Sequence, residues 1–428
     1  MAPLRFAVLG AGGRGQAYGD YLLRYPQAGA VTAVADPDEE RLRLYAAKHR
    51  IQPSGLYPSW EALLEARPAV DAVIITTQDR MHTAPALRAL ELGYDVLLEK
   101  PMSPEPAEVA AIAEAAERHG RTLMVCHVLR YTPFMQAVKR LLDSGVIGRL
   151  VSVQWTENVG WYHVAHSYVR GNWRRTAESS PMILAKSCHD LDLIHWLVGE
   201  PCLQVSSFGS LMHFRPENAP PGATARCTDG CPAEPNCPYS ALKIYMGNGP
   251  DWVVWAATAD PSPEGRLRAL QEGPYGRCVY HCDNDVVDHQ VVNLAYQSGL
   301  TVSFSMVGFS REITRTAKLF GTHGEMRIQM ERNEIEINDF NGRQTVVRPE
   351  ILPGGHNGGD TALMRAFVQQ VQTKDPSLNL SPARVSAETH LLAFAAEESR
   401  LTGRTIDFQA YARRFDLTKS DQTDPMNG

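Results

Sequence analysis

Residues 5–15 read Arg-Phe-Ala-Val-Leu-Gly-Ala-Gly-Gly-Arg-Gly, a short apolar run that passes into a cluster of glycines. The apolar run predicts a strand, the glycines a turn, and the residues that follow a helix to about Arg24. In this context a G-x-G-x-x-G pattern predicts a dinucleotide site. Gly10 allows the tight turn, Gly12 lets the backbone approach a pyrophosphate, and Gly15 permits close packing of the helix on the strand. The helix N-terminus would then hold the phosphates through its free N–H groups.

Further strands are predicted at 31–35, 71–75, 95–98 and 122–125, separated by stretches that suit helices. This alternation is typical of a doubly wound parallel sheet, the Rossmann form of the α/β class. The carboxyl ends of parallel strands meet at one edge. We therefore expect the glycine turn and the residues after each strand to line one crevice.

Asp36 follows the second predicted strand. A carboxylate at this place accepts hydrogen bonds from the ribose hydroxyls and repels a 2′-phosphate, so it favours NAD over NADP. Arg41 and Arg43 lie one to two helical turns further on and weaken this preference. Alternatively, Asp36 followed by Pro37 caps the next helix.

Lys100 closes the fourth predicted strand and precedes Pro101. Proline disfavours helix at the residue before it, so Lys100 is expected in extended backbone at the ligand-binding edge of the sheet. Taken alone, a Lys-Pro pair would also fit a lysine at a surface turn.

Composition excludes several classes of function. The 428 residues include 42 Lys and Arg against 48 Asp and Glu, a net charge of -6 that offers no basic surface for nucleic acid or acidic membrane. The chain begins without a leader pattern, and no apolar run is long enough to span a bilayer. We expect a cytoplasmic protein that acts on a small molecule.

The chain resembles the Gfo/Idh/MocA family of NAD(P)-dependent sugar and cyclitol oxidoreductases. The resemblance covers nearly the whole chain and rests on the motifs at 8–15, 76–82, 99–101, 188–192 and 196–199. It implies that Lys100 lies beside the nicotinamide and the reacting hydroxyl, and that Glu99 helps to bind the cofactor. The candidate cofactor-binding residues are Gly10, Gly12, Gly13, Arg14, Gly15, Asp36, Thr76, Thr77, Gln78, His82, Glu99 and Lys100.

We expect a dinucleotide-binding domain at 1–125, an α+β substrate domain at 126–418 and a mobile tail at 419–428. Strand-like runs at 286–296, 299–309, 315–320 and 325–337 resemble the open, mainly antiparallel sheet of the family. One face of that sheet covers the active site in such enzymes. Its other face commonly pairs subunits, which implies a homo-oligomer.

The segment 161–175 is dense in aromatic and hydrogen-bonding side chains. A sugar ring stacks on aromatic side chains while its hydroxyls pair with polar ones, so this segment is a candidate carbohydrate lining. Alternatively, its aromatic residues only pack on the sheet. The candidate substrate-binding residues are His163, His166, Trp173, Arg174, Lys186, Asp285 and His289, with Asp283 and His356 as further loop candidates.

His189 is the candidate proton acceptor, because imidazole titrates near neutral pH. In the enzymes that the chain resembles, this histidine acts with the Lys-Pro lysine and with an aspartate four residues earlier. That earlier position is Ala185 here, so Lys186 is the candidate replacement for the missing carboxylate partner of His189. Lys186 would act either as a proton carrier or as a binder of an anionic substrate group. Positive charge beside His189 would favour its neutral form. Alternatively, His189 is a core histidine; Asp192 suits a structural role on the same helix.

Between about 214 and 277 the composition shifts to Pro, Gly and small polar residues, which indicates an insertion. Cys227, Cys231 and Cys237 lie within it, and Cys278 or Cys282 could supply a fourth thiolate for a structural zinc. Plain thiols are equally compatible with this spacing. A disulfide suits the expected compartment less well.

Three functions compete at this point. The first is NAD-dependent oxidation of a secondary hydroxyl of a sugar, glycoside or cyclitol, with Lys100, His189 and Lys186 as catalytic candidates. The second is an NAD-dependent glycoside hydrolase that oxidises, eliminates, hydrates and re-reduces its substrate with retained NAD. The third is a cofactor-binding regulator, which the presence of both Lys100 and His189 disfavours.

Overall fold

The computed structural model describes residues 3–247 and 249–416, so the expected tail at 419–428 lies outside the described residues. The N-terminal part is built on a six-stranded sheet whose neighbours all run parallel. In spatial order its strands are β3 (Leu56–Tyr57), β2 (Gly29–Ala35), β1 (Leu4–Leu9), β4 (Ala72–Ile75), β5 (Asp95–Leu98) and β6 (Leu123–Val125).

The central strands are apolar because helices cover both faces of this sheet. All residues of β4 are completely buried, as expected for a strand inside a doubly wound fold. The covering helices are α1 (Gly13–Arg24), α2 (Glu39–His49), α3 (Trp60–Ala66), α4 (Thr83–Glu91) and α5 (Pro106–Arg118). The predicted Rossmann architecture is therefore confirmed, with β3 as an edge strand that the sequence pattern did not indicate.

The second sheet has nine strands and is antiparallel except where β10 runs parallel to β7. In spatial order these are β14 (Gln344–Val347), β13 (Glu334–Asp339), β12 (Gly324–Gln329), β11 (Thr314–Gly321), β7 (Leu150–Asn158), β10 (Thr301–Val307), β9 (His289–Tyr296), β8 (Cys202–Ser210) and β15 (Ile406–Asp407). The mainly antiparallel sheet of the α+β part is confirmed. The predicted single run at 325–337 is wrong, because a turn at Met330–Arg332 divides it into β12 and β13.

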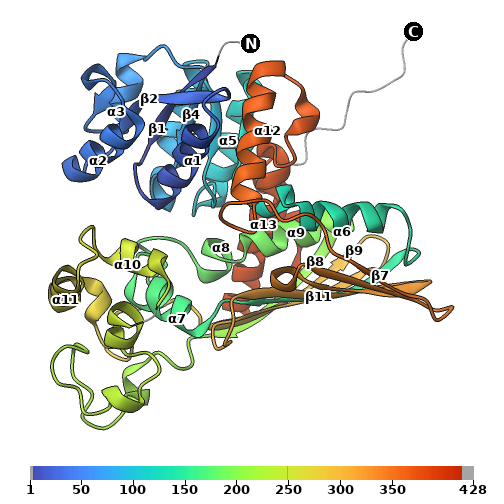
Figure 1. The fold of residues 1–428 in the computed structure, drawn as a ribbon. Coiled ribbons are helices and arrows are strands. Elements are labelled where there is room, and N and C mark those ends of the chain that lie inside the picture. The colour runs from blue at the N-terminus through green and yellow to red at the C-terminus, as the bar shows by residue number, and fades with distance from the viewer. Residues whose placement is uncertain (1–2, 248, 417–428) are drawn as a thin grey trace.

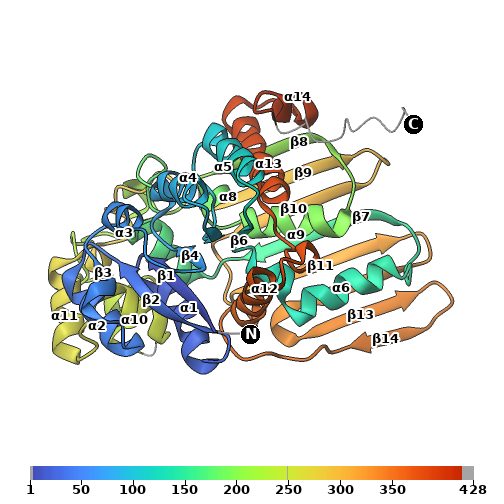
Figure 2. The same ribbon diagram turned by 90° about the horizontal axis from the view of Figure 1, so that it is seen from above.

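Helices cover one face of the second sheet and leave the other face open (Figures 1 and 2). The covering helices are α6 (Pro133–Asp143), α9 (Cys188–Val198) and α13 (Ala383–Thr402), and α14 (Phe408–Arg413) packs at the β8 edge. Another C-terminal helix, α12 (Gly359–Thr373), returns to the first domain and packs against α1. The chain thus passes between the two sheets more than once. These crossings hold the two domains in place on either side of the crevice.

The insertion forms a lobe on the far side of the crevice from the Rossmann sheet (Figure 1). It begins after β8 and is built from short helices: η5 (Pro216–Asn218), η6 (Glu234–Asn236), η7 (Leu242–Met246), α10 (Asp251–Ala257), α11 (Pro263–Glu272) and η8 (Pro274–Gly276). It packs on α7 (Trp161–His163) and η4 (Val164–Arg170), which follow β7. None of the helices in the described part of the chain is long and apolar enough to cross a membrane.

Candidate active site

The glycine turn between β1 and α1 has the shape that a dinucleotide requires. Gly10 has a φ of 95°, and a Cβ atom there would lie 2.7 Å from the carbonyl oxygen of Thr76. A Cβ atom at Gly15 would lie 2.1 Å from the carbonyl oxygen of Gly10, so close packing requires glycine here too. Above Gly12 and Gly13, by contrast, a Cβ atom would meet nothing within 4 Å, and no side chain caps the N-terminus of α1. The loop therefore offers free N–H groups and open space for a pyrophosphate.

Asp36 lies beside this turn at the end of β2. Its side chain is buried, and its two oxygens accept the main-chain N–H groups of Ala11, at 2.8 Å, and of Asp38, at 3.0 Å. The Arg41 guanidinium lies 3.6 Å from the same carboxylate. The carboxylate is thus fixed next to the glycine turn, where a ribose attached to the pyrophosphate would lie.

Lys100 follows β5, and its peptide bond to Pro101 is cis. Its ammonium nitrogen reaches across the crevice and donates a hydrogen bond of 2.9 Å to the carbonyl oxygen of Ala185, the last residue of α8 (Met182–Ala185). The preceding Glu99 carboxylate accepts the N–H of Lys100 at 2.8 Å, which holds the main chain at this turn. Lys100 therefore joins the edge of the Rossmann sheet to the second domain.

His189 follows Ala185 by four residues, after the turn that joins α8 to α9, and is buried. Burial, followed by the charge of Lys100 and the imidazoles of His127 and His356, lowers the pKa of His189 well below its usual value. Its Nδ1 atom is buried and has no hydrogen-bond partner within residues 3–247 and 249–416. A neutral imidazole with a free nitrogen thus stands beside an ammonium group, at the crevice between the domains.

Family profiles cover most of the chain. The profile described as the oxidoreductase family, NAD-binding Rossmann fold, matches residues 4–127, and the C-terminal alpha/beta domain of the same oxidoreductase family matches 139–408. The chain belongs to the Gfo/Idh/MocA oxidoreductase family.

Individual relatives agree with this assignment. Inositol 2-dehydrogenase 4 of Saccharopolyspora erythraea is 32% identical over 52% of this chain and 61% of its own length. The 2,7-anhydro-N-acetylneuraminate hydratase of Escherichia coli is 27% identical over 50% of this chain and 55% of its own length. The match therefore spans less than two thirds of each of these two relatives. A solved oxidoreductase domain protein of Kribbella flavida shares the fold, with a TM-score of 0.72, 19% identity and coverage of 95% of this chain and 100% of its own.

Lys186 of this Gfo/Idh/MocA chain has a carboxylate partner that the sequence did not reveal. Its ammonium nitrogen lies 3.0 Å from Glu157 on β7, so Lys186 pairs with an acid and not with His189. Arg315 lies 3.0 Å from the other oxygen of Glu157 and 2.9 Å from Asp190. Burial raises the pKa of Glu157 to about 6, although the charges of Arg315 and Lys186 oppose this shift. Only long-range strand pairing brings Glu157 to this place, and no sequence motif marks it.

A loop before α12 brings His356 to the same site. The ring of His356 lies 6.0 Å from that of His189, and its Nδ1 atom lies 3.0 Å from the Asp360 carboxylate. The φ of His356 is 52°, in a region that non-glycine residues seldom adopt. The sequence indicated His356 only as a loop candidate; Asp360, which orients it, had no expected role.

Arg14 is a predicted cofactor residue whose guanidinium is already paired. It lies 2.6 Å from Glu99 and 2.8 Å from Asp360, and it donates to the Tyr18 hydroxyl at 2.6 Å. Burial alone would lower the pKa of Arg14, but these neighbours raise it well above its usual value. The Arg14 side chain therefore connects the glycine turn with the loop of His356, and its contact with the cofactor stays a prediction.

The loop after β4 is held by its own polar groups. His82 is buried between the carbonyl oxygens of Pro101, at 2.7 Å, and Thr77, at 3.0 Å, so it positions the turn of Lys100. The Thr76 hydroxyl donates to the Gly10 carbonyl at 2.7 Å. Gln78 precedes the 3-10 turn at Asp79–Met81. These residues border the predicted cofactor site, and the contacts of His82 and Thr76 show how they shape it.

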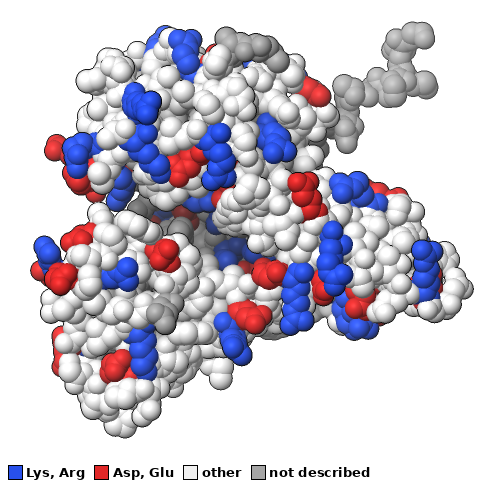
Figure 3. All heavy atoms as spheres, viewed as in Figure 1, with Lys and Arg blue, Asp and Glu red and all other residues white. Residues whose placement is uncertain are grey.

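Among the predicted substrate residues, His163 and Trp173 lie at the crevice. Burial, then the charges of Lys186, His166 and Lys100, lowers the pKa of His163 well below its usual value. The Trp173 indole donates to the Asp79 carboxylate at 3.1 Å, which ties the second domain to the loop after β4. Surface atoms show a recess between the Rossmann part and the insertion, with basic side chains inside it (Figure 3).

The other four predicted substrate residues have local partners. His166 is 3% exposed, lies 2.7 Å from the Tyr245 hydroxyl and stacks on Tyr275, so it packs inside the insertion. Arg174 pairs with Asp283 at 2.9 Å, Asp285 accepts from the main chain of Thr176 at 2.7 Å, and His289 pairs with Asp288 at 2.9 Å. Each of the four side chains thus has a partner within the protein, and their contact with a substrate stays a prediction.

The predicted zinc site is not supported. Cys227, Cys231 and Cys237 line a small cavity together with Cys278. However, within residues 3–247 and 249–416 no group of three or more His, Cys, Asp or Glu side chains is placed to hold a metal ion. Cys227 accepts the N–H of Ala241 at 3.3 Å, so its sulfur is engaged with the backbone.

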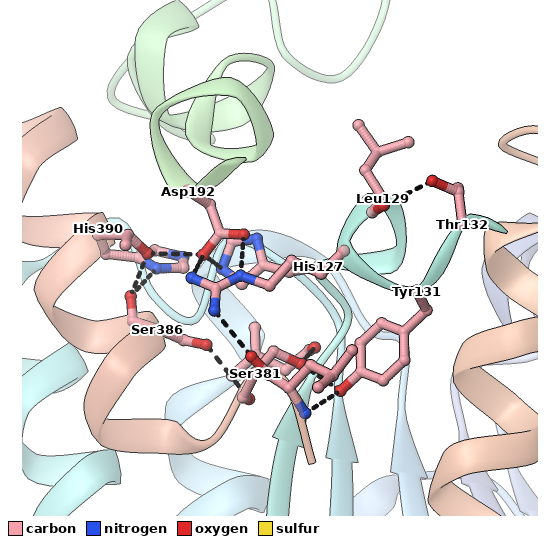
Figure 4. A network of polar contacts seen from close by, with 12 residues as sticks. His127, Leu129, Tyr131, Thr132, Asp192, Ser381, Ser386 and His390 are labelled. Carbon is pink, nitrogen blue, oxygen red and sulfur yellow. Dashed lines mark hydrogen bonds and ion pairs between the residues drawn. The ribbon is translucent and has the colours of Figure 1, made fainter. Parts of the chain in front are cut away.

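A buried polar network surrounds Asp192 (Figure 4). Arg130 donates twice to Asp192, each bond 2.7 Å long, and His127 lies 3.6 Å from the same carboxylate. The His127 ring is 5.8 Å from that of His189 and 5.3 Å from that of His390 on α13. Asp192 thus has the structural role that its place on the helix indicated, because it neutralises a buried arginine that joins three segments.

Proposed function

We propose that this chain is an NAD-dependent oxidoreductase that oxidises a secondary hydroxyl group of a sugar, glycoside or cyclitol. The observation that carries the proposal is the position of Lys100. It lies at the carboxyl edge of the Rossmann sheet and donates to the carbonyl oxygen of Ala185, four residues before His189. The glycine turn, the uncapped α1 and the fixed Asp36 fit a dinucleotide at that edge. The inositol dehydrogenase among the relatives supports a cyclitol or a sugar as substrate.

The residues divide the work as follows. Bound NAD would supply the hydride acceptor. An ammonium group carries three donors, so Lys100 keeps donors for the substrate oxygen besides the one given to Ala185. His189, held neutral, accepts the hydroxyl proton while Lys100 stabilises the negative charge that develops on the oxygen. The C–H and O–H bonds of the substrate break, and a carbonyl group and an imidazolium result.

Asp36 supports NAD over NADP as the cofactor. A buried carboxylate beside the glycine turn suits ribose hydroxyls and opposes a phosphate there. The Arg41 guanidinium already lies close to this carboxylate and is thereby partly neutralised.

The activity is tested with purified protein, NAD or NADP, and a panel of free sugars, cyclitols and aryl glycosides. Steady accumulation of NADH with at least one free sugar or cyclitol supports the dehydrogenase. If the protein binds NAD and converts no compound of any class, the proposal is wrong.

The runner-up is a redox-neutral NAD-dependent glycoside hydrolase, and His356 favours it. Elimination and hydration need a second acid–base group besides the one that serves the oxidised hydroxyl. His356 lies 6.0 Å from His189 and is oriented by Asp360, so it could serve the leaving group. The hydratase among the relatives is a further reason to keep this function in view.

His356→Asn separates the two functions. For a dehydrogenase, the variant should keep most of its turnover of free sugars. If the enzyme is a hydrolase, the wild-type protein should release the aglycone from aryl glycosides without net NADH. In His356→Asn that release should fall by about 10²–10⁴-fold. If His356→Asn releases the aglycone as fast as wild type does, His356 has no part in the mechanism.

The open face of the second sheet supports pairing of subunits. Phe208 is 63% exposed, and its cross-strand neighbour Val291 on β9 is 37% exposed. Covering these side chains with a second copy removes apolar surface from water. A monomer in light scattering at micromolar concentration would argue against the homo-oligomer.

A further inference from the structure

Helix α10 of the insertion carries two exposed tryptophans near the recess. Trp252 is 42% exposed and Trp255 60%, although both belong to a helix of seven residues. Figure 1 places α10 on the side of the insertion that faces the Rossmann part, beside α7 and α8. Of the two, Trp252 is the one whose ring contacts the segment after β7, and its accessible part presents apolar surface to the recess.

Three rings of the segment after β7 support Trp252 from beneath. Its ring lies 5.0 Å from His163 and 5.1 Å from His166, both edge to face, and 6.4 Å from Tyr162. This support fixes the indole plane, while a large part of its surface stays accessible. Trp252 is therefore a preorganised platform and not a loose surface side chain.

His163 connects this platform to the catalytic candidates. The charges of Lys186 and Lys100 contribute to the low pKa of His163, after the larger effect of burial, so both ammonium groups lie close to it. His163 is therefore neutral at physiological pH; the backbone of Val159 bonds to its ring, and its Nδ1 atom has no hydrogen-bond partner among the described residues. His163 thus interacts electrostatically with Lys100 on one side and contacts the Trp252 ring on the other.

The backbone beneath the platform is irregular in the same place. Residues Val164–Arg170 and Leu242–Met246 are both π-helical, and His166 joins them through the Tyr245 hydroxyl at 2.7 Å. Such wide turns are often found at functional sites. Here η4 follows directly after Tyr162 and His163, the two residues of α7 that contact Trp252.

We propose that Trp252 and His163 form a second carbohydrate subsite, which holds the ring attached to the one that reacts at Lys100. A sugar ring has an apolar face of C–H groups and a rim of hydroxyls, so it can cover the indole while a hydroxyl pairs with His163. A purely apolar ligand would leave the imidazole unpaired, and a purely ionic one would leave the indole exposed. The preferred substrates are thus glycosides or disaccharides rather than single rings. This inference rests on the proposed function, because Lys100 defines the reacting end.

The test compares two-ring with one-ring compounds. Cellobiose, maltose, lactose and aryl glycosides are set against glucose, galactose and myo-inositol, in wild type and in Trp252→Ala. Loss of one stacked ring should lower kcat/KM for two-ring substrates about tenfold and leave one-ring substrates within about twofold. Trp255→Ala is the matched control, because it removes an indole from the same helix that is more exposed than Trp252. His163→Gln, which keeps a donor and an acceptor, should lose less than His163→Ala.

Binding of the same sugars is measured by calorimetry with NAD present, so the result does not depend on turnover. Tighter binding of two-ring compounds by wild type, lost in Trp252→Ala and kept in Trp255→Ala, supports the subsite. Equal losses for one-ring and two-ring compounds, or none, overturn it and leave the proposed oxidoreductase function standing. If wild type oxidises no sugar yet shows the binding pattern, the proposed function fails and the subsite stands.

Discussion

The ammonium nitrogen of Lys100 lies 2.9 Å from the main-chain carbonyl oxygen of Ala185, where the family resemblance leads us to expect an aspartate. A carbonyl group orients the lysine and does not neutralise it. The full positive charge of Lys100 therefore acts on His189, four residues after Ala185. This charge contributes to the low pKa of His189, after the larger effect of burial. A site with Ala185 thus holds its histidine in the base form more firmly than a site with a carboxylate would.

A carboxylate in place of Ala185 should change the pH dependence of the oxidation. Ala185→Asp places a negative charge beside Lys100 and His189, which should raise the pKa of His189 toward its usual value. Because the oxidation needs neutral imidazole, the acidic limb of the kcat/KM profile should move to higher pH. Ala185→Asn has the same shape without the charge and should leave the limb in place. Identical profiles for the two variants would contradict the electrostatic account, provided that both melt near the wild-type temperature.

Lys100→Ala should abolish turnover without abolishing cofactor binding. The variant loses the group that stabilises charge on the substrate oxygen, so kcat should fall by roughly 10²–10⁴-fold. The glycine turn and Asp36 remain, and the affinity for NADH, measured by its fluorescence, should change little. Lys139→Ala, which removes an i,i+4 ion pair with Asp143 on the surface of α6, is the control. Full activity in Lys100→Ala would remove this lysine from the mechanism.

Glu157 gives a prediction about stability and pH. Its pKa in the folded protein is about 6, above the ordinary 4.5, so the folded state binds more protons than the unfolded state between these values. The contribution of Glu157 to stability is therefore complete below pH 4.5 and is lost as the pH rises through 6. Relative to wild type, Glu157→Gln should gain about 2 kcal/mol between pH 4.5 and 7.

Urea unfolding at both pH values measures this gain. Glu114→Gln is a suitable control, because Glu114 is an exposed acid on α5 and should show no such change. A constant difference between wild type and Glu157→Gln would mean that folding does not shift the pKa of Glu157.

The sequence predicted the parts of the site that local patterns encode. The glycine turn, Asp36 and the Lys-Pro pair each follow a strand, and parallel strands bring their carboxyl ends to one edge regardless of long-range detail. Glu157 and His356 could not be found in this way. Glu157 faces the site because β7 pairs with β11, and His356 because α12 returns to the first domain. Both depend on contacts between distant parts of the chain.

Arg14 shows a different limit. Its place in the glycine motif indicated a contact with the cofactor, but Glu99 and Asp360 hold its guanidinium. A motif fixes the backbone that approaches a phosphate, whereas the direction of a long side chain depends on the charges that the tertiary fold brings near. Arg174 is a similar case, because Asp283 holds its guanidinium in an ion pair.

Asp36→Ala should weaken the preference for NAD over NADP. The substitution removes the oxygens that would accept the ribose hydroxyls and leaves the Arg41 guanidinium, now 3.6 Å from a carboxylate, free to meet a 2′-phosphate. The ratio of kcat/KM for NAD to that for NADP should fall roughly tenfold or more, since a hydrogen bond to a charged group contributes about 1.5–3 kcal/mol. Glu40→Ala serves as the control, because Glu40 is an exposed acid on the same helix as Arg41 and pairs with Arg43. If Asp36→Ala and Glu40→Ala keep the same ratio as wild type, Asp36 acts only by fixing the glycine turn through Ala11.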